Sequence, residues 1–218
     1  MKTKKIYLLF SGTGTLLSRT IDLYTGKSLN HVSLSLDRAL TRVYSFGRKR
    51  PSNPFSGGFV KEDFNSPLFN QTNCAIYELE VTEEAYNQLS KKISLMELEQ
   101  HLYNYNFLGL LGVMFNIEFH REKAYFCSQF VAAILQKYDL YPKTKPACFV
   151  RPEDLRAWDQ LKLIYHGAII EYPCFDYQPE NGSRQTIYSI FSYYNSFISH
   201  RIQQTKLIVL ESLRHFRY

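Results

Sequence analysis

Cys127 and His31 are the two residues of this sequence whose types and surroundings suit covalent catalysis. Cys127 begins residues 127–138 (CSQFVAAILQKY), where apolar residues recur at helical spacing. A thiol in the first turn of a helix lies at the positive end of the helix dipole, which favours the nucleophilic thiolate. His31 lies on the polar side of residues 30–36 (NHVSLSL), which alternate like a half-buried strand. There its imidazole can act as a general base.

A cysteine and a histidine together are the minimum apparatus for acyl transfer through a thioacyl intermediate. Cys127 would attack a carbonyl carbon, and His31 would accept the thiol proton. The backbone N–H groups of Cys127 and Ser128 have no partners within the helix, so they are the expected donors to the oxyanion. The acyl group would then pass to water or to another acceptor.

Strands and helices of suitable length surround both residues. Strands are predicted at residues 5–10, 30–36, 42–46 and 75–81, with one or two more within 161–172. Helices are predicted at residues 16–24, from the N-cap Thr82 to about residue 103, at 127–138, and from 152 to about 161. Residues 47–58 contain five glycine or proline residues and a basic cluster, and they predict an exposed loop.

Three segments resemble a known group of proteins. Residues 30–36 look like the histidine strand of the circularly permuted papain-like proteins, and residues 126–132 (FCSQFVA) look like their nucleophile helix. Residues 151–155 (RPEDL) are similar to the segment that follows. The group includes the lecithin–retinol acyltransferase type and YiiX-like bacterial proteins, which are related to NlpC-type peptidases. Permutation places histidine before cysteine, as here, and a catalytic triad depends on geometry rather than chain order.

The resemblance covers roughly residues 5–165 and implies both a fold and an activity. The implied fold is α+β and permuted papain-like, with an antiparallel sheet packed against the nucleophile-bearing helix. The implied activity is a cysteine hydrolase or acyltransferase acting on amide, ester or thioester bonds, with Cys127 as nucleophile and His31 as general base. The substrate would be a small-molecule, peptide or lipid-like acyl compound, and no cofactor is implied.

The third catalytic residue is less clearly marked. Relatives often carry a polar side chain on the strand after the histidine strand, and Ser45 holds the nearest position here. Ser45 is therefore predicted to orient His31, with Glu62 beyond the loop as the alternative. Asp37 is about 20 Å from His31 along an extended strand and is not expected to serve. His120, seven residues before Cys127, is a rival base that we expect to be a loop residue.

The remaining cysteines and histidines form no recognisable metal or redox motif. Cys74, Cys148 and Cys174 are separated by long gaps, with no C-x-x-C pair and no H-E-x-x-H. We expect these three thiols to be inert and to lie in loops or at strand edges. No metal site is predicted.

Composition limits the class of protein. The chain has 218 residues, of which 45% are hydrophobic and 21% charged, and this balance is typical of a globular protein. The net charge of +6 is compatible with an anionic partner, but no nucleic-acid partner is expected. No apolar run reaches the roughly 18 residues of a membrane span. The N-terminal residues predict a first strand rather than a signal peptide, so a cytoplasmic location is expected.

The C-terminal part differs from the rest of the chain. We predict a hydrolase domain over residues 1–178 and an amphipathic helical extension over 179–218. Residues 183–218 are basic, with apolar residues three and four apart, so they could pack on the domain or on a sister subunit, or touch an anionic membrane. The oligomeric state does not follow from the sequence.

Three functions remain open at this stage. The leading prediction is a hydrolase that releases the acyl group to water. The first alternative is a binding module that keeps the fold and has lost turnover, which the missing acidic partner of His31 and the basic surface would favour. The second is an acyltransferase acting at a membrane surface.

Overall fold

The computed structural model describes residues 2–12, 29–48, 57–65, 72–115, 117–119 and 121–175. The chain divides into two compact units, Met1–Tyr177 and Gln178–Tyr218, and all described residues belong to the first. The sequence-based boundary, between residues 178 and 179, lies one residue further along the chain.

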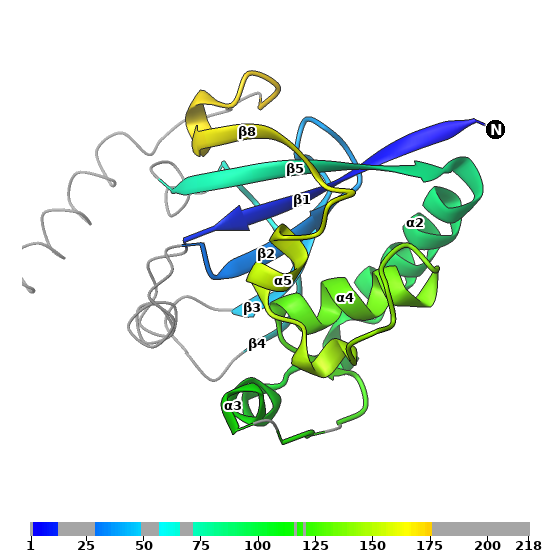
Figure 1. Cartoon of the computed structure of the whole chain (residues 1–218), viewed down its shortest axis with the longest axis vertical. Coiled ribbons are helices and arrows are strands. Elements are labelled where there is room, and N and C mark those ends of the chain that lie inside the picture. Colours follow the sequence, from blue (N-terminus) through cyan, green and yellow to red (C-terminus); the bar gives the residue numbers. More distant parts are fainter. Residues whose placement is uncertain are drawn as a thin grey trace, which may run out of the picture. The chain divides into compact units, whose positions relative to one another are not determined.

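Six strands form one antiparallel sheet in the order β4-β3-β2-β1-β5-β8 (Figure 1). Their bounds are β1 Thr3–Ser11, β2 His31–Ser35, β3 Val43–Arg48, β4 Gly57–Glu62, β5 Asn73–Thr82 and β8 Lys162–Ala168. The mixed α+β class with an antiparallel sheet is therefore confirmed.

The described part of this unit also contains helices and short turns. The α-helices are α2 Glu83–Leu98, α3 Phe107–Phe115, α4 Cys127–Lys137 and α5 Pro152–Arg156. Short 3-10 turns are η1 Gln100–Leu102, η2 Ala147–Phe149 and η3 Ile169–Glu171. A small parallel pair joins β6 Asn104–Tyr105 to β7 Ala124–Tyr125, which leads directly into α4.

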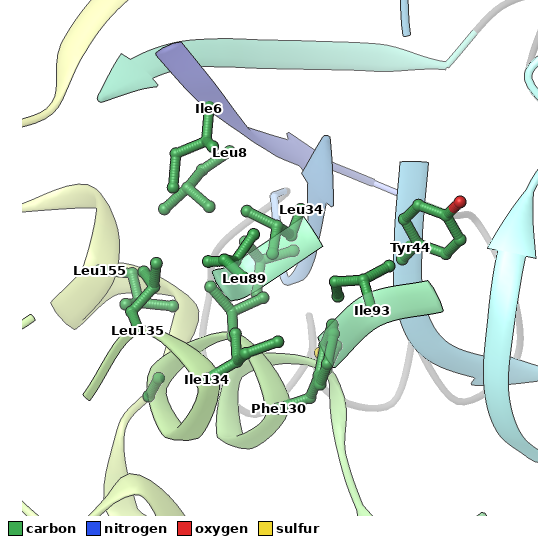
Figure 2. Close-up of a cluster of buried hydrophobic side chains, with 14 of the residues drawn as sticks. Ile6, Leu8, Leu34, Tyr44, Leu89, Ile93, Phe130, Ile134, Leu135 and Leu155 are labelled. Atoms are coloured by element: carbon green, nitrogen blue, oxygen red, sulfur yellow. The ribbon is translucent and has the colours of Figure 1, made fainter. Parts of the chain in front are cut away.

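The main core lies between one face of the sheet and helices α2 and α4. Figure 2 shows side chains of α2, α4, β1 and β2 meeting in this cluster. It contains Ile6 and Leu8 of β1, Leu34 of β2, Leu89 and Ile93 of α2, and Phe130, Ile134 and Leu135 of α4. Each such side chain contributes about 1.5–3 kcal/mol by leaving water. This packing fixes α4, and with it Cys127, against the sheet.

A second apolar cluster covers the opposite face of the sheet. It contains Tyr7 and Leu9 of β1, Val43 of β3, Ile76 of β5, and Ile169 and Tyr172 after β8. Ser33 and Ser35 of β2, which pair with Leu9 and Tyr7, are fully buried on this face.

Most predicted elements are confirmed, but the predicted ends of two helices and of one loop are wrong. The helix capped by Thr82, whose hydroxyl accepts from the Ala85 N–H at 3.1 Å, ends at Leu98 instead of about residue 103. A 3-10 turn follows and brings Tyr103 into the core. The helix after residue 151 ends at Arg156, because the chain turns there and packs Trp158 edge-on to Tyr141.

The predicted loop over residues 47–58 is wrong at both ends. Gly47 and Arg48 belong to β3, and Gly57 and Gly58 begin β4. Six successive pairs, from Val43↔Glu62 to Arg48↔Gly57, join these two strands. The ladder thus overrides the weak strand propensity of glycine.

Several predictions fall outside the described residues. These are the helix at 16–24, His120, most of the basic loop, and the extension over 179–218 with its membrane-contact hypothesis. They stay predictions. Among the helices that are described, none combines the length and apolarity needed to cross a membrane.

Candidate active site

Cys127 is the first residue of α4 and is 7% exposed. The residue before it, Phe126, has an extended backbone, and its N–H donates to the Gln129 side-chain oxygen at 3.4 Å. The helix therefore starts at the cysteine. The backbone N–H groups of Val32 and Ser128 both donate to the sulfur. The thiol thus faces amide donors from the sheet as well as from its own helix.

His31 is the first residue of β2 and pairs with Ser11 of β1. Its imidazole is hydrogen-bonded to both Cys127 and Glu62. Nε2 lies 2.7 Å from Oε1 of Glu62, which leaves Nδ1 as the nitrogen for the sulfur. The side chains of His31 and Glu62 are only 13% and 7% exposed. The structure therefore brings Cys127 and His31 into direct contact.

Glu62 is the last residue of β4, and its carboxylate is hydrogen-bonded to the His31 imidazole. Its Oε1 also accepts from the Ser45 hydroxyl at 2.5 Å, and its Oε2 accepts from the Ser33 hydroxyl at 2.8 Å. Ser33 lies on β2 and Ser45 on β3, so three adjacent strands contribute to the network. The carboxylate is held by three hydrogen bonds in a buried position.

Glu62 and Cys127 approach His31 from different sides of the sheet. Strand alternation places His31 and Ser33 on the face opposite to Val32 and Leu34, which pack in the core cluster beneath α4. The pairs recorded between β2 and β3 are Leu34↔Tyr44 and Ser35↔Val43. No pair between β2 and β3 is recorded closer to His31. There the Val32 N–H donates to the Cys127 sulfur instead. The end of β2 therefore lets one imidazole contact both groups.

The electrostatics of the three groups favour an ion pair. Burial alone lowers the pKa of His31, but the Glu62 charge and hydrogen bonds to Cys127 and Glu62 outweigh it and raise that pKa well above its usual value. Burial raises the pKa of Cys127, but the hydrogen bond and charge of His31 and the two backbone N–H donors lower it overall. The pKa of Glu62 is lowered for the corresponding reason, against its burial. All three shifts favour the charged forms, which are the thiolate, the imidazolium and the carboxylate.

The prediction that Ser45 orients His31 is corrected by this geometry. Ser45 lies on the expected strand, but its hydroxyl donates to Glu62, and Glu62 is the group on the imidazole. The sequence predicts Glu62 only as the alternative orienting residue for His31, and the structure places its carboxylate on the imidazole. Asp37 accepts from the N–H groups of Thr41 and Arg42 in the β2–β3 turn, away from His31 as expected.

Ser128 lies beside the nucleophile in the first turn of α4. Its backbone N–H donates to the Cys127 sulfur, and its hydroxyl donates to the Val150 carbonyl oxygen at 2.7 Å. The second bond ties the start of α4 to the segment after η2. The Ser128 N–H, one of the two predicted oxyanion donors, thus lies at the Cys127 sulfur.

The other cysteines lie in different surroundings. Cys74 is in β5, paired with Ser11 on one side and Gly167 on the other, so its expected place in a loop or at a strand edge is wrong. Burial raises the pKa of Cys74 to about 12. Burial and the nearby Glu118 raise the pKa of Cys148, in η2, to about 11. Both thiols are therefore poor nucleophiles near neutral pH.

A surface hollow of about 380 Å³ lies elsewhere on this unit. It is lined mainly by residues 139–143, after α4, together with Leu79, Glu80, Trp158 and Gln160. Cys127, His31 and Glu62 are not part of its lining. Within the described ranges, no three His, Cys, Asp or Glu side chains gather closely enough to hold a metal ion.

No family model, curated protein or solved structure matches the chain.

Proposed function

We propose that this protein is a cysteine hydrolase with a circularly permuted papain-like fold, which cleaves amide, ester or thioester bonds through a thioacyl intermediate on Cys127. The observation that carries the proposal is the buried hydrogen-bonded chain from Cys127 through His31 to Glu62. A cysteine kept only for packing needs neither a histidine nor two amide donors at its sulfur. The order and spacing of the sequence motifs support the same interpretation.

In the first half-reaction, the Cys127 thiolate attacks the substrate carbonyl carbon and forms a carbon–sulfur bond. The carbonyl oxygen becomes an oxyanion, for which the N–H groups at the start of α4 are the donors. Collapse of this intermediate breaks the bond to the leaving group, which takes the proton from Nδ1 of His31. Glu62 stabilises the imidazolium until that proton is transferred.

In the second half-reaction, neutral His31 accepts a proton from water, and the resulting hydroxide attacks the thioacyl carbon. The carbon–sulfur bond then breaks, which releases the acid and restores the thiolate beside imidazolium. An alcohol or amine in place of water would give acyl transfer by the same steps. All of these steps use residues of this chain and the substrate.

The alternative of an inactive binding module loses one of its two supports. Two features motivate that alternative: the absence of an acidic partner for His31 from the sequence pattern, and the basic surface of the chain. Glu62 supplies such a partner at 2.7 Å and is itself hydrogen-bonded by two serines.

Activated-ester cleavage tests the proposal without knowledge of the natural substrate. With p-nitrophenyl acetate at pH 7, we expect p-nitrophenol release and a transient acetyl group on Cys127, detected by peptide mass spectrometry. Cys127→Ala should reduce release to the rate of the reagent alone, because no other described thiol is paired with a histidine. Cys148→Ala, which removes a half-buried cysteine, is the matched control and should leave release unchanged. Equal release by wild type and Cys127→Ala would overturn the proposal.

A further inference from the structure

Two buried serines surround the carboxylate of Glu62. Ser33 and Ser45 are both 0% exposed, and neither hydroxyl contacts solvent or the nucleophile directly. Ser33 immediately precedes Leu34 on β2, and Ser45 immediately follows Tyr44 on β3. Leu34 and Tyr44 pair with each other, so the two serines lie side by side on neighbouring strands. The Glu62 side chain, which begins on β4, extends over β3 between them. The network is therefore built from three strands that follow one another in the sequence and lie side by side in the sheet.

Each hydrogen bond restrains a different degree of freedom of Glu62. A glutamate carboxylate rotates broadly about its last side-chain bond, so one contact to His31 would not fix its plane. Ser33 holds Oε2, while Ser45 holds Oε1, the same oxygen that faces Nε2 of His31. Two donors on two oxygens fix the plane and aim Oε1 at the imidazole.

The serines also compensate for burial of the charge. A carboxylate removed from water is destabilised unless donors replace the lost hydration. The hydrogen bonds from Ser45 and Ser33 both lower the pKa of Glu62, together with the charge of His31. His31 is the ionisable group in contact with Glu62, and Cys127 of α4 is the other ionisable group in contact with His31.

A third serine on the same face shows that such a hydroxyl need not serve the site. Ser35, two residues after Ser33 on β2, is also 0% exposed. Its hydroxyl donates to the Asp37 carbonyl oxygen at 2.7 Å, within the turn after β2. Ser33 and Ser35 thus share strand, face, size and burial, and differ in whether they bind Glu62.

We infer that Ser33 and Ser45 are positioning residues that hold Glu62 against His31 and thereby set the pH range in which Cys127 is nucleophilic. They act through Glu62 and need not touch the substrate. The inference rests on the proposed function, because it assigns the serines to the same Cys127–His31–Glu62 chain. It adds a second layer of residues that controls the activity of that chain with pH.

The test is the rate of iodoacetamide alkylation of Cys127 as a function of pH, followed by peptide mass spectrometry. Wild type is compared with Ser33→Ala, Ser45→Ala and the matched control Ser35→Ala. Each of the first two variants should raise the midpoint of the profile by about one pH unit, or reduce the rate at pH 6 about tenfold. Ser35→Ala should leave the profile unchanged even if it lowers the melting temperature. Ser45→Thr, which keeps the hydroxyl, should restore the profile of wild type if Ser45→Ala folds poorly.

The outcomes separate this inference from the proposed function. If wild-type Cys127 titrates no lower than an ordinary thiol, at about 8.5, the proposed function fails, and the role of the serines fails with it. If wild-type Cys127 titrates low, but Ser33→Ala and Ser45→Ala both behave like Ser35→Ala, only the role of the serines is overturned.

Discussion

Replacing Glu62 by glutamine should shift the pH profile of Cys127 alkylation upward by about 1 to 3 units, the range expected for loss of a close opposite charge. The amide keeps the size of the side chain and removes its charge. Without that charge, burial lowers the pKa of His31, so the imidazolium that stabilises the thiolate is lost. The pKa of Cys127 then rises toward the value set by its own burial. At any pH below the new midpoint, less thiolate is present and alkylation slows.

Glu78→Gln is the matched control for this substitution. Glu78 lies on β5 of the same sheet, and its carboxylate pairs with Lys5 at 2.9 Å, away from His31. It should change neither the Cys127 profile nor the rate of p-nitrophenyl acetate cleavage. A Glu62→Gln profile equal to that of Glu78→Gln would remove Glu62 from the proposed mechanism.

Replacing Phe130 by alanine should lower the free energy of unfolding by about 3 to 5 kcal/mol, as expected for a large aromatic side chain removed from a core. Phe130 is 2% exposed and lies one turn after Cys127 on α4. The centroid of its ring lies 5.2 Å from that of Phe46 of β3 and 5.7 Å from that of Phe59 of β4. No neighbour can fill such a volume without moving the helix, so a cavity or a shift of α4 results.

Urea denaturation measures this change directly. We expect a lower midpoint with an unchanged slope, because the surface exposed on unfolding is nearly the same. Leu98→Ala, at a position of α2 that is 78% exposed, should stay within about 0.5 kcal/mol of wild type. A loss below about 1 kcal/mol for Phe130→Ala would contradict the packing of α4 described above.

Local sequence patterns are sufficient to predict the elements that carry Cys127 and His31. The alternation of residues 30–36 predicts β2, and the helical spacing after Cys127 predicts α4. Both signals depend on neighbours in sequence, which is why they can be recognised in one chain. The contact between Cys127 and His31 was inferred from the chemistry of the pair and from the order of the motifs.

Glu62 could be named from the sequence only as an alternative because its contact with His31 is non-local. β4 begins with Gly57 and Gly58, which have weak strand propensity, and therefore no pattern marks it as a strand. The order β4-β3-β2 is needed to place Glu62 across β3 from His31. Ser45 is predicted from its position on the strand after the histidine strand, and it lies in the same network with Glu62 as its partner.

The sequence contains a weak indication that Ser33 has a buried partner. The polar face of residues 30–36 contains two serines after His31, where a plain half-exposed strand would accept larger polar side chains. Both serines are fully buried, which indicates that space on this face is limited. Ser33, two positions from His31, therefore indicates that a buried polar partner lies on this face, and that partner is Glu62.

The most direct test of the central claim is the alkylation rate of each cysteine against pH in wild type and His31→Ala. We predict that wild-type Cys127 reacts with a midpoint well below the ordinary thiol value of about 8.5, and that His31→Ala abolishes this shift. Cys74 and Cys148, whose pKa values are raised to about 12 and about 11, serve as slow internal references in the same digest. If Cys127 reacts no faster than these two, or if His31→Ala leaves its profile unchanged, the Cys127–His31 pair is not a catalytic one.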